Sequence, residues 1–314
     1  MANHDVYIVG AGASCPFGMP TSNALKRELC ENPALATDQL MRGIDSFRLP
    51  HGVNPVLQRV SELSTQFRFS NAQSIDRFLE NRPDHVDLGK KLLAALLLPK
   101  EEEALHRWPH DGDWIGWLTS RYFDGTDDPA DAHVTIITFN YDRLVEFGIG
   151  MMLANTRGQG ANALELANRV PIIHVYGRCE SPAAFKDGHI TTRYTPKSRD
   201  ETAKSIKIIS DERTEDDDTQ LALAREKLFN ARRVVFLGFG YDRINLKRLG
   251  IYEGSAEWST RLPNFNVFGT AFGLRGQKLK DLLRPFGPQR ITPKHLGKPD
   301  QPCLSYLEDH IPND

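Results

Sequence analysis

Three polar side chains lie in or directly after apolar stretches, where they could act on a ligand. Asn140 and Asp142 follow the run Val134–Thr138, and His174 lies within the apolar run 172–176. An asparagine offers both a donor and an acceptor to a hydroxyl group or a water. A neutral imidazole titrates near physiological pH and therefore suits general-base catalysis. These properties make Asn140 and His174 candidate catalytic residues.

Asp142 and His174 also have a structural interpretation. Asp142 directly precedes a stretch with a helical pattern, so its carboxylate could cap that helix. A lone histidine in an apolar strand is more often a hydrogen-bonded core residue than a catalytic one. The functional interpretation depends on whether other unusual residues gather at the same place.

Two glycine-rich turns supply such residues. Gly10–Ser14 follows the apolar run Val6–Val9, and Gly238–Asp242 follows Val234–Leu237. Glycine allows the backbone to approach a ligand closely, and free amide groups at a helix start attract phosphate. Pro20 and Thr21 are helix-start signals. We therefore expect a loop of about eight residues before the helix, able to fold over a ligand as a lid.

The first turn differs from the dinucleotide-binding turn of dehydrogenases. The third glycine of G-x-G-x-x-G would fall at position 15, which is Cys15. The acidic residue that binds a ribose about 20 residues later has no second strand on which to sit. A dehydrogenase is therefore the weakest of the enzymatic interpretations.

The arrangement of apolar runs predicts the fold class. Continuous apolar runs without alternation indicate strands that are buried on both faces. Helical patterns separate several of them, so we predict an α/β fold, a Rossmann-like parallel sheet flanked by helices. The expected strands are 6–9, 134–138, 172–176, 234–237 and 266–268, and the expected helices are 21–30, 143–155, 219–230 and 277–283.

The spacing of these elements predicts the domain organisation. We expect one domain over residues 1–314, with a helical insertion over 31–133 that includes helices near 74–80 and 88–105. Residues 180–220 are polar, and their acidic run, which includes Glu215–Asp218, is expected to form a solvated loop or a helix start. Residues 246–314 are expected to form a C-terminal extension with one strand and a short helix.

Composition excludes several classes of protein. The chain has 314 residues, 39 of them basic and 41 acidic, for a net charge of −2. That balance does not predict direct nucleic-acid binding. The four cysteines are scattered without a C-x-x-C pair, which argues against a disulfide framework and a structural zinc site. With neither a signal peptide nor a long apolar run, we expect a cytoplasmic protein without a membrane segment and without a metal.

Taken together, the motifs resemble those of sirtuin-like NAD-consuming domains. The matching segments are Gly10–Ser14, Thr138–Asp142, His174–Gly177 and Gly238–Asp242. Gly18–Thr21 and Ser74–Leu79 look like the bacterial branch of that family. The resemblance extends over about residues 5–245 and is far more specific than any one motif. The four-cysteine zinc module of protein-deacylating sirtuins is missing, and Tyr176, not a histidine, precedes Gly177.

The resemblance implies an NAD+ hydrolase of the zinc-free, anti-phage defence type, which cleaves NAD+ to nicotinamide and ADP-ribose and so depletes NAD. Asn140 and His174 would be catalytic, although the base could instead belong to the Tyr176 position. The residues expected at the cofactor are Gly10, Ala11, Gly12, Ala13, Ser14, Thr21, Asp142, Tyr176, Gly177, Gly238, Phe239, Gly240 and Asp242.

Unregulated NAD+ loss would be toxic, so we expect the resting protein to be held inactive. The expected controls are homo-oligomerisation or a separate activating partner, such as a HerA-like ATPase or an Argonaute-type sensor. Two alternatives stay open. One is an NAD-dependent deacylase or ADP-ribosyltransferase, and the other is a non-catalytic sensor that binds NAD or ADP-ribose.

Overall fold

A parallel five-stranded sheet forms the centre of the protein. The computed structural model describes residues 4–44, 54–208, 215–252, 255–261, 266–275, 279, 284–286 and 295–312. The strands are β1 (Asp5–Val9), β2 (Val134–Thr138), β3 (Ile172–His174), β6 (Arg233–Leu237) and β7 (Asn266–Gly269). Their order is β3-β2-β1-β6-β7, and every neighbouring pair is parallel. The predicted fold class is confirmed, and all five strands come from the predicted apolar runs.

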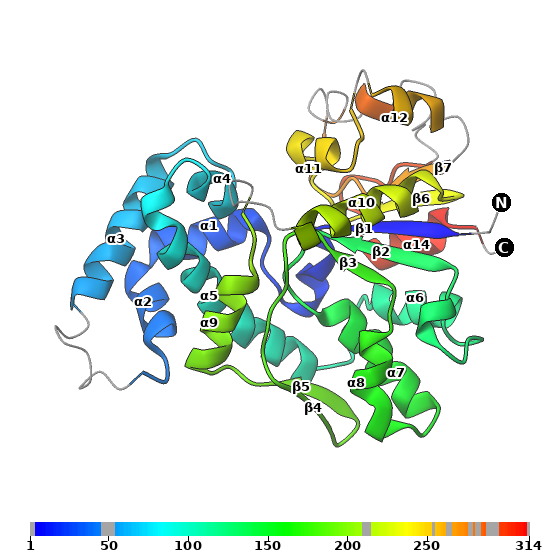
Figure 1. Ribbon diagram of the computed structural model, residues 1–314, viewed down its shortest axis with the longest axis horizontal. Coiled ribbons are helices and arrows are strands. Elements are labelled where there is room, and N and C mark those ends of the chain that lie inside the picture. Colours follow the sequence, from blue (N-terminus) through cyan, green and yellow to red (C-terminus); the bar gives the residue numbers. More distant parts are fainter. Residues whose placement is uncertain are drawn as a thin grey trace.

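Helices cover both faces of the sheet. Successive side chains of a strand point to opposite faces and therefore pack into different apolar clusters. Tyr7 and Val9 of β1 belong to one apolar cluster, and Val6 and Ile8 to another. The first cluster includes residues of α5 (Val86–His106), α6 (Trp114–Tyr122), α7 (Leu144–Thr156) and α14 (Cys303–His310). The second includes residues of α10 (Glu215–Phe229), α11 (Arg243–Arg248) and α12 (Ala256–Arg261). The result is a three-layered α/β/α arrangement, visible in Figure 1.

Helices make up most of the described part of residues 31–133. Those before α6 form a lobe beside the sheet together with α1 (Ser22–Glu31) and α9 (Pro196–Ser205), whereas α6 lies next to α7 (Figure 1). The helices of this stretch are α2 (Pro33–Met41), α3 (Asn54–Phe69), α4 (Ile75–Leu79), α5 and α6, with 3-10 turns at Pro83–His85 and Pro129–Asp131. The predicted helices near 74–80 and 88–105 correspond to α4 and α5. The domain boundaries stay a prediction.

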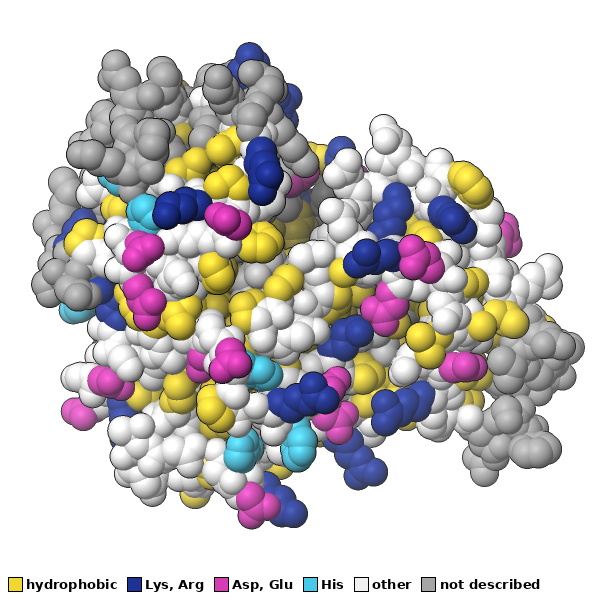
Figure 2. All heavy atoms as spheres, turned by 180° about the vertical axis from the view of Figure 1, so that it is seen from behind, with side chains coloured by type: hydrophobic (Ala, Val, Ile, Leu, Met, Phe, Trp, Pro, Cys, Tyr) yellow, Lys and Arg dark blue, Asp and Glu magenta, His cyan; other side chains and the backbone are white. Residues whose placement is uncertain are grey.

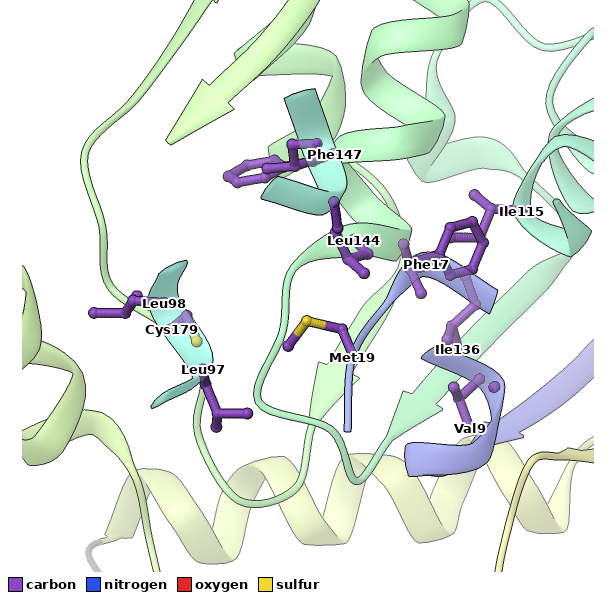
Figure 3. Close-up of a cluster of buried hydrophobic side chains, with 14 of the residues drawn as sticks. Val9, Phe17, Met19, Leu97, Leu98, Ile115, Ile136, Leu144, Phe147 and Cys179 are labelled. Carbon is purple, nitrogen blue, oxygen red and sulfur yellow. The ribbon is translucent and has the colours of Figure 1, made fainter. Parts of the chain in front are cut away.

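The connection after β1 differs from its prediction. Helix α1 (Ser22–Glu31) begins where expected, with Thr21 as its cap: the Thr21 hydroxyl accepts from the Ala24 amide at 3.2 Å. The segment before it is a 3-10 helix, Ala11–Phe17, not a loop free to close as a lid. Phe17 is buried and its ring stacks on Trp108 with centroids 5.0 Å apart. Figure 3 shows Phe17 beside Ile115 within the apolar cluster, which explains why this segment is held down.

Residues 180–220 contain regular structure that was not predicted. Strands β4 (Ala183–Lys186) and β5 (His189–Thr192) form an antiparallel hairpin, followed by α9 (Pro196–Ser205). The hairpin turn places Asp187 and Gly188 at positive φ, as a two-residue turn requires. The short strands have no long apolar pattern, so no strand was predicted there. The acidic run Glu215–Asp218 begins α10.

The remaining helices are close to their predicted bounds. Predicted 143–155 corresponds to α7, which is followed by a 3-10 turn (Gly160–Asn162) and by α8 (Ala163–Asn168). The helix predicted over 219–230 corresponds to α10, which begins four residues earlier and ends one residue earlier. The helix predicted over 277–283 lies almost wholly outside the described residues. A 3-10 turn (Arg284–Phe286) precedes α14. In the described part of the chain, no helix is both long and apolar enough to cross a bilayer.

Candidate active site

The two glycine turns pack directly against each other at the carboxyl ends of β1 and β6. The Gly10 amide donates to the Leu237 carbonyl at 3.0 Å, and the Gly12 amide to the Gly238 carbonyl at 2.9 Å. A Cβ atom on Gly12 would lie 2.8 Å from the Gly238 oxygen, and Gly238 has a φ of +54°. These glycines are therefore needed for the contact between the turns. This is the place where the strand order reverses, at which open α/β sheets bind ligands.

Amides of the first turn are already used inside the protein. Besides Gly10 and Gly12, Ala13 donates its amide to the Gly10 carbonyl at 2.9 Å. The Trp114 indole donates to the Ala13 carbonyl at 2.7 Å. A phosphate bound at this turn would have to use other donors, so the expected role of residues 10–13 at a pyrophosphate stays a prediction.

Asn140 joins β2 to the first turn. Its side-chain nitrogen Nδ2 donates to the Gly10 carbonyl at 3.1 Å and to the Ser14 hydroxyl at 2.9 Å. The side chain is thereby oriented, and the residue is only 7% exposed. Its other polar atom, Oδ1, accepts no hydrogen bond from the residues that the structure describes. An oriented amide with an available acceptor can hold a water or a sugar hydroxyl.

Asp142 lies beside the same serine. The Ser14 hydroxyl hydrogen-bonds its carboxyl group, and the Leu144 amide donates to Oδ1 at 3.4 Å. Burial, together with the nearby carboxylate of Glu101, raises the pKa of Asp142 from an ordinary 3.8 to about 7, and Glu146 adds to the rise. A carboxyl group with such a pKa can take up or release a proton near neutral pH. Ser14 thus links an oriented amide to a titratable acid.

Both ring nitrogens of His174 face acceptors. Nε2 lies 3.1 Å from Oε1 of Glu146, and Nδ1 lies 3.2 Å from the main-chain oxygen of Asn140. The side chains of His174 and Glu146 are 7% and 3% exposed. Burial opposes the charged form of His174, but the Glu146 carboxylate and the Asn140 carbonyl outweigh it and raise the pKa of the imidazole. Burial likewise works against ionisation of Glu146, yet His174 lowers the pKa of that carboxyl group. Each partner thus favours the charged form of the other.

A second buried ion pair supports the start of α7. Glu101 of α5 is completely buried; its Oε1 accepts from the Arg143 amide at 2.7 Å and its Oε2 from the Arg143 guanidinium at 3.2 Å. The guanidinium also donates to the Ser181 hydroxyl at 2.7 Å. This network holds the residue that follows Asp142, and so fixes the loop that carries Asn140 and Asp142.

Tyr176 and Gly177 lie next to α11. The Tyr176 hydroxyl donates to Oδ1 of Asn245, and the Arg248 guanidinium lies 4.7 Å from the centre of the Tyr176 ring. Gly177 has a φ of +75°, and a Cβ there would meet the Ser205 carbonyl. Burial raises the pKa of Tyr176 far above its ordinary value, so this phenol is neutral at physiological pH. The Tyr176 ring also packs edge-on against Phe139.

The remaining predicted residues are less closely connected to this centre. Asp242 caps α11 by accepting from the Ile244 and Asn245 amides at 2.9 and 3.2 Å. Thr21 caps α1, as described above. Phe239 is buried and packs against Phe139, whereas Gly240 has open space beside it. The structure thus brings together Gly10, Ser14, Asn140, Asp142 and His174, with Gly238 directly behind the first turn.

Sequence reasoning missed the two buried glutamates of the site. Glu146 lies in an otherwise apolar helical stretch, and such a charge in an apolar pattern is a signal that a partner is needed. Glu101 lies in a run of three glutamates, where nothing in the sequence distinguishes it from Glu102 and Glu103. Among the described residues no group of three or more His, Cys, Asp or Glu is arranged to hold a metal ion. On the face shown in Figure 2, basic and acidic side chains are interspersed.

Solved structures similar to this chain include Sir2 homologues. One is a triple mutant in complex with 2′-O-acetyl ADP ribose, 11% identical, with 98% of this chain and 90% of that chain covered and a TM-score of 0.42. Another is a Sir2 homolog–NAD complex, 12% identical, with 98% and 87% covered and a TM-score of 0.43. Neither the protein-family models nor the curated proteins include a match. Because these identities and TM-scores are low, the description of the fold and of the site rests on the strand order and the contacts given above.

Proposed function

We propose that the chain hydrolyses NAD+ to nicotinamide and ADP-ribose. The observation that carries the proposal is the orientation of Asn140. Its amide is held by Gly10 and Ser14 at the carboxyl ends of the strands, where the strand order reverses. The motifs of the sequence add the kind of ligand, because their order resembles that of NAD-consuming domains. A titratable carboxyl group, Asp142, lies at the same place.

The reaction breaks the bond between the nicotinamide nitrogen and C1′ of the ribose. Because the nitrogen already carries a positive charge, nicotinamide can leave with the bonding electrons without a general acid. The developing oxocarbenium ion is then attacked by water. Asn140 would orient that water or a ribose hydroxyl, and holding the reactants in place supplies much of the acceleration. The proton released by the water needs an acceptor among the titratable side chains of this site, which include His174 and Asp142.

Chromatographic analysis of the products tests the proposal. The purified chain incubated with NAD+ should release nicotinamide and ADP-ribose in equal amounts, and Asn140→Ala should abolish this release. Asn168→Ala is a matched control, because Asn168 is an exposed asparagine at the end of α8. It lies just before the amino end of β3, whereas the site lies at the carboxyl ends of the strands. If Asn140→Ala consumes NAD+ at the parental rate, the site is assigned wrongly.

The same assay separates the alternatives. An NAD-dependent deacylase would require an acylated peptide and would form acyl-ADP-ribose, and a transferase would label a protein. A sensor would bind NAD+, as measured by calorimetry, without releasing nicotinamide. The buried acid next to an oriented amide favours turnover, because a site for binding alone has no need for a group that titrates near neutral pH.

The proposal extends to control of the activity in an anti-phage defence system. The resting chain would be held inactive and activated by assembly or by a separate sensor. Activity that rises more steeply than linearly with protein concentration, or upon addition of a partner, would support this. Full activity of the isolated monomer without additions would refute it.

A further inference from the structure

We infer that Asp142 accepts the proton of the attacking water, and that His174, held between Glu146 and the main chain of Asn140, is a positioning residue. The inference rests on the proposed hydrolysis of NAD+ and assigns a role within the same site. It reverses the assignment that motif spacing favours, in which His174 is the base.

The contacts of His174 leave it no nitrogen with which to act as a base. Its two neighbours at hydrogen-bond distance, Glu146 Oε1 and the Asn140 carbonyl, both accept, so each ring nitrogen must carry a proton. An imidazolium with both protons bonded has no lone pair for a water. Its bond to the Asn140 carbonyl instead fixes the loop that presents the Asn140 and Asp142 side chains. His174 therefore acts through Asn140.

Asp142 has the position and the surroundings that a base requires. It is 6% exposed and connects through Ser14 to the oriented amide of Asn140. The charged and titratable groups that act on it are Glu101 from α5, Glu146 near the start of α7, Cys15 after β1 and Cys179 after β3. Glu146 is paired with His174 and Arg143 with Glu101. Asp142 itself has no cationic partner among the described residues, so its carboxylate keeps its basicity.

The step is balanced without a further reactant. The C1′–N bond breaks and its electron pair goes to nicotinamide. The water oxygen forms the new bond to C1′, and one water proton passes to the Asp142 carboxylate, which later releases it to solvent. The products are nicotinamide, ADP-ribose and one proton.

The dependence of kcat/KM on pH tests the inference. The parent should lose activity as the pH falls through about 7, where Asp142 becomes protonated. Asp142→Asn should lose about 10²–10⁴-fold in kcat, the usual contribution of a general base, while still binding ADP-ribose in calorimetry. Formate should restore part of the activity of Asp142→Ala. In His174→Gln the loss of activity below pH 7 should persist, because the inference assigns it to protonation of Asp142. A loss of activity that survives this substitution cannot be due to His174.

A second variant keeps the test decisive if His174→Gln does not fold. Arg178 is 43% exposed, and its charge opposes protonation of His174 but is not among the main causes of the pKa shift of Asp142. Arg178→Gln should therefore leave the pH profile unchanged. Two results would overturn the inference while leaving NAD+ hydrolysis intact. One is a shift of the pH profile to higher pH in Arg178→Gln, and the other is a loss of activity below pH 7 that persists in Asp142→Asn. A parent that releases no nicotinamide would instead overturn the proposed function, and this inference with it.

Discussion

The carbonyl oxygen of Gly238 accepts a hydrogen bond from the amide of Gly12 over 2.9 Å, and this bond joins the turns that follow β1 and β6. The two turns are 226 residues apart in the chain, as the positions 12 and 238 show. They form one unit at the carboxyl ends of the strands, and Asn140 is hydrogen-bonded to this unit through the Gly10 carbonyl. A change in one turn should therefore affect the whole site.

Gly238→Ala should destabilise the protein. The positive φ of Gly238 alone would cost an alanine about 1–2 kcal/mol, and the new Cβ would overlap the Ala13 nitrogen. The midpoint of urea unfolding should therefore fall markedly. Gly240→Ala is the matched control two residues away, because a Cβ on Gly240 would have no atom within 4 Å, and it should unfold like the parent. Equal midpoints for both variants would contradict this account of the turns.

Ser14→Ala should slow turnover about fivefold, since it removes one of the two hydrogen bonds that orient Asn140, worth about 1 kcal/mol. The Ser14 hydroxyl also lowers the pKa of Asp142, so its removal should raise that pKa. The pH below which activity is lost should consequently move upwards. Steady-state kinetics over a range of pH measures both effects, with Ser120→Ala on the exposed side of α6 as the control. A downward movement would show that Ser14 does not stabilise the carboxylate.

Asp142→Asn should stabilise the protein at alkaline pH. The folded pKa of about 7 lies above the unfolded value of 3.8, so the folded state holds the proton more tightly. The stability contributed by the protonated carboxyl is present in full below about pH 3.8 and is lost as the pH rises through 7. Asparagine cannot ionise, so its advantage should grow between about pH 4 and pH 7 and then level off, at a few kcal/mol. Chemical unfolding at several pH values measures the difference, and a variant less stable than the parent at pH 8 would contradict it.

Glu101→Ala should cost about 3–5 kcal/mol of unfolding free energy, because it leaves the buried Arg143 without its carboxylate. Glu103, two residues along α5, forms an exposed pair with Arg107, with side chains 55% and 69% exposed for Glu103 and Arg107. Its replacement by alanine should cost less than about 1 kcal/mol. Urea unfolding of the two variants provides a matched comparison. Similar losses in both would mean that the Arg143 pair adds nothing beyond a surface pair.

The fold was largely predictable from local patterns. Runs such as Val134–Thr138 lack charged residues and do not alternate, because each residue is buried on one face or the other of a covered parallel sheet. The cap at Thr21 and the start of α1 depend on neighbouring residues alone and were predicted correctly. The hairpin over 183–192 was not predicted, since its short strands have only a weak alternation.

In the candidate site, too, some features could be predicted from the sequence and others could not. Asn140, Asp142 and His174 could be found from the chain alone, because each lies at a strand end or in an apolar run. Their protonation could not, because it depends on groups brought close only by folding. Glu101 raises the pKa of Asp142 from 41 positions away, and Glu146 reaches His174 from a neighbouring helix. Burial and through-space charge depend on distance in space, which is why folding makes Asp142 the group that titrates near neutral pH and engages both ring nitrogens of His174.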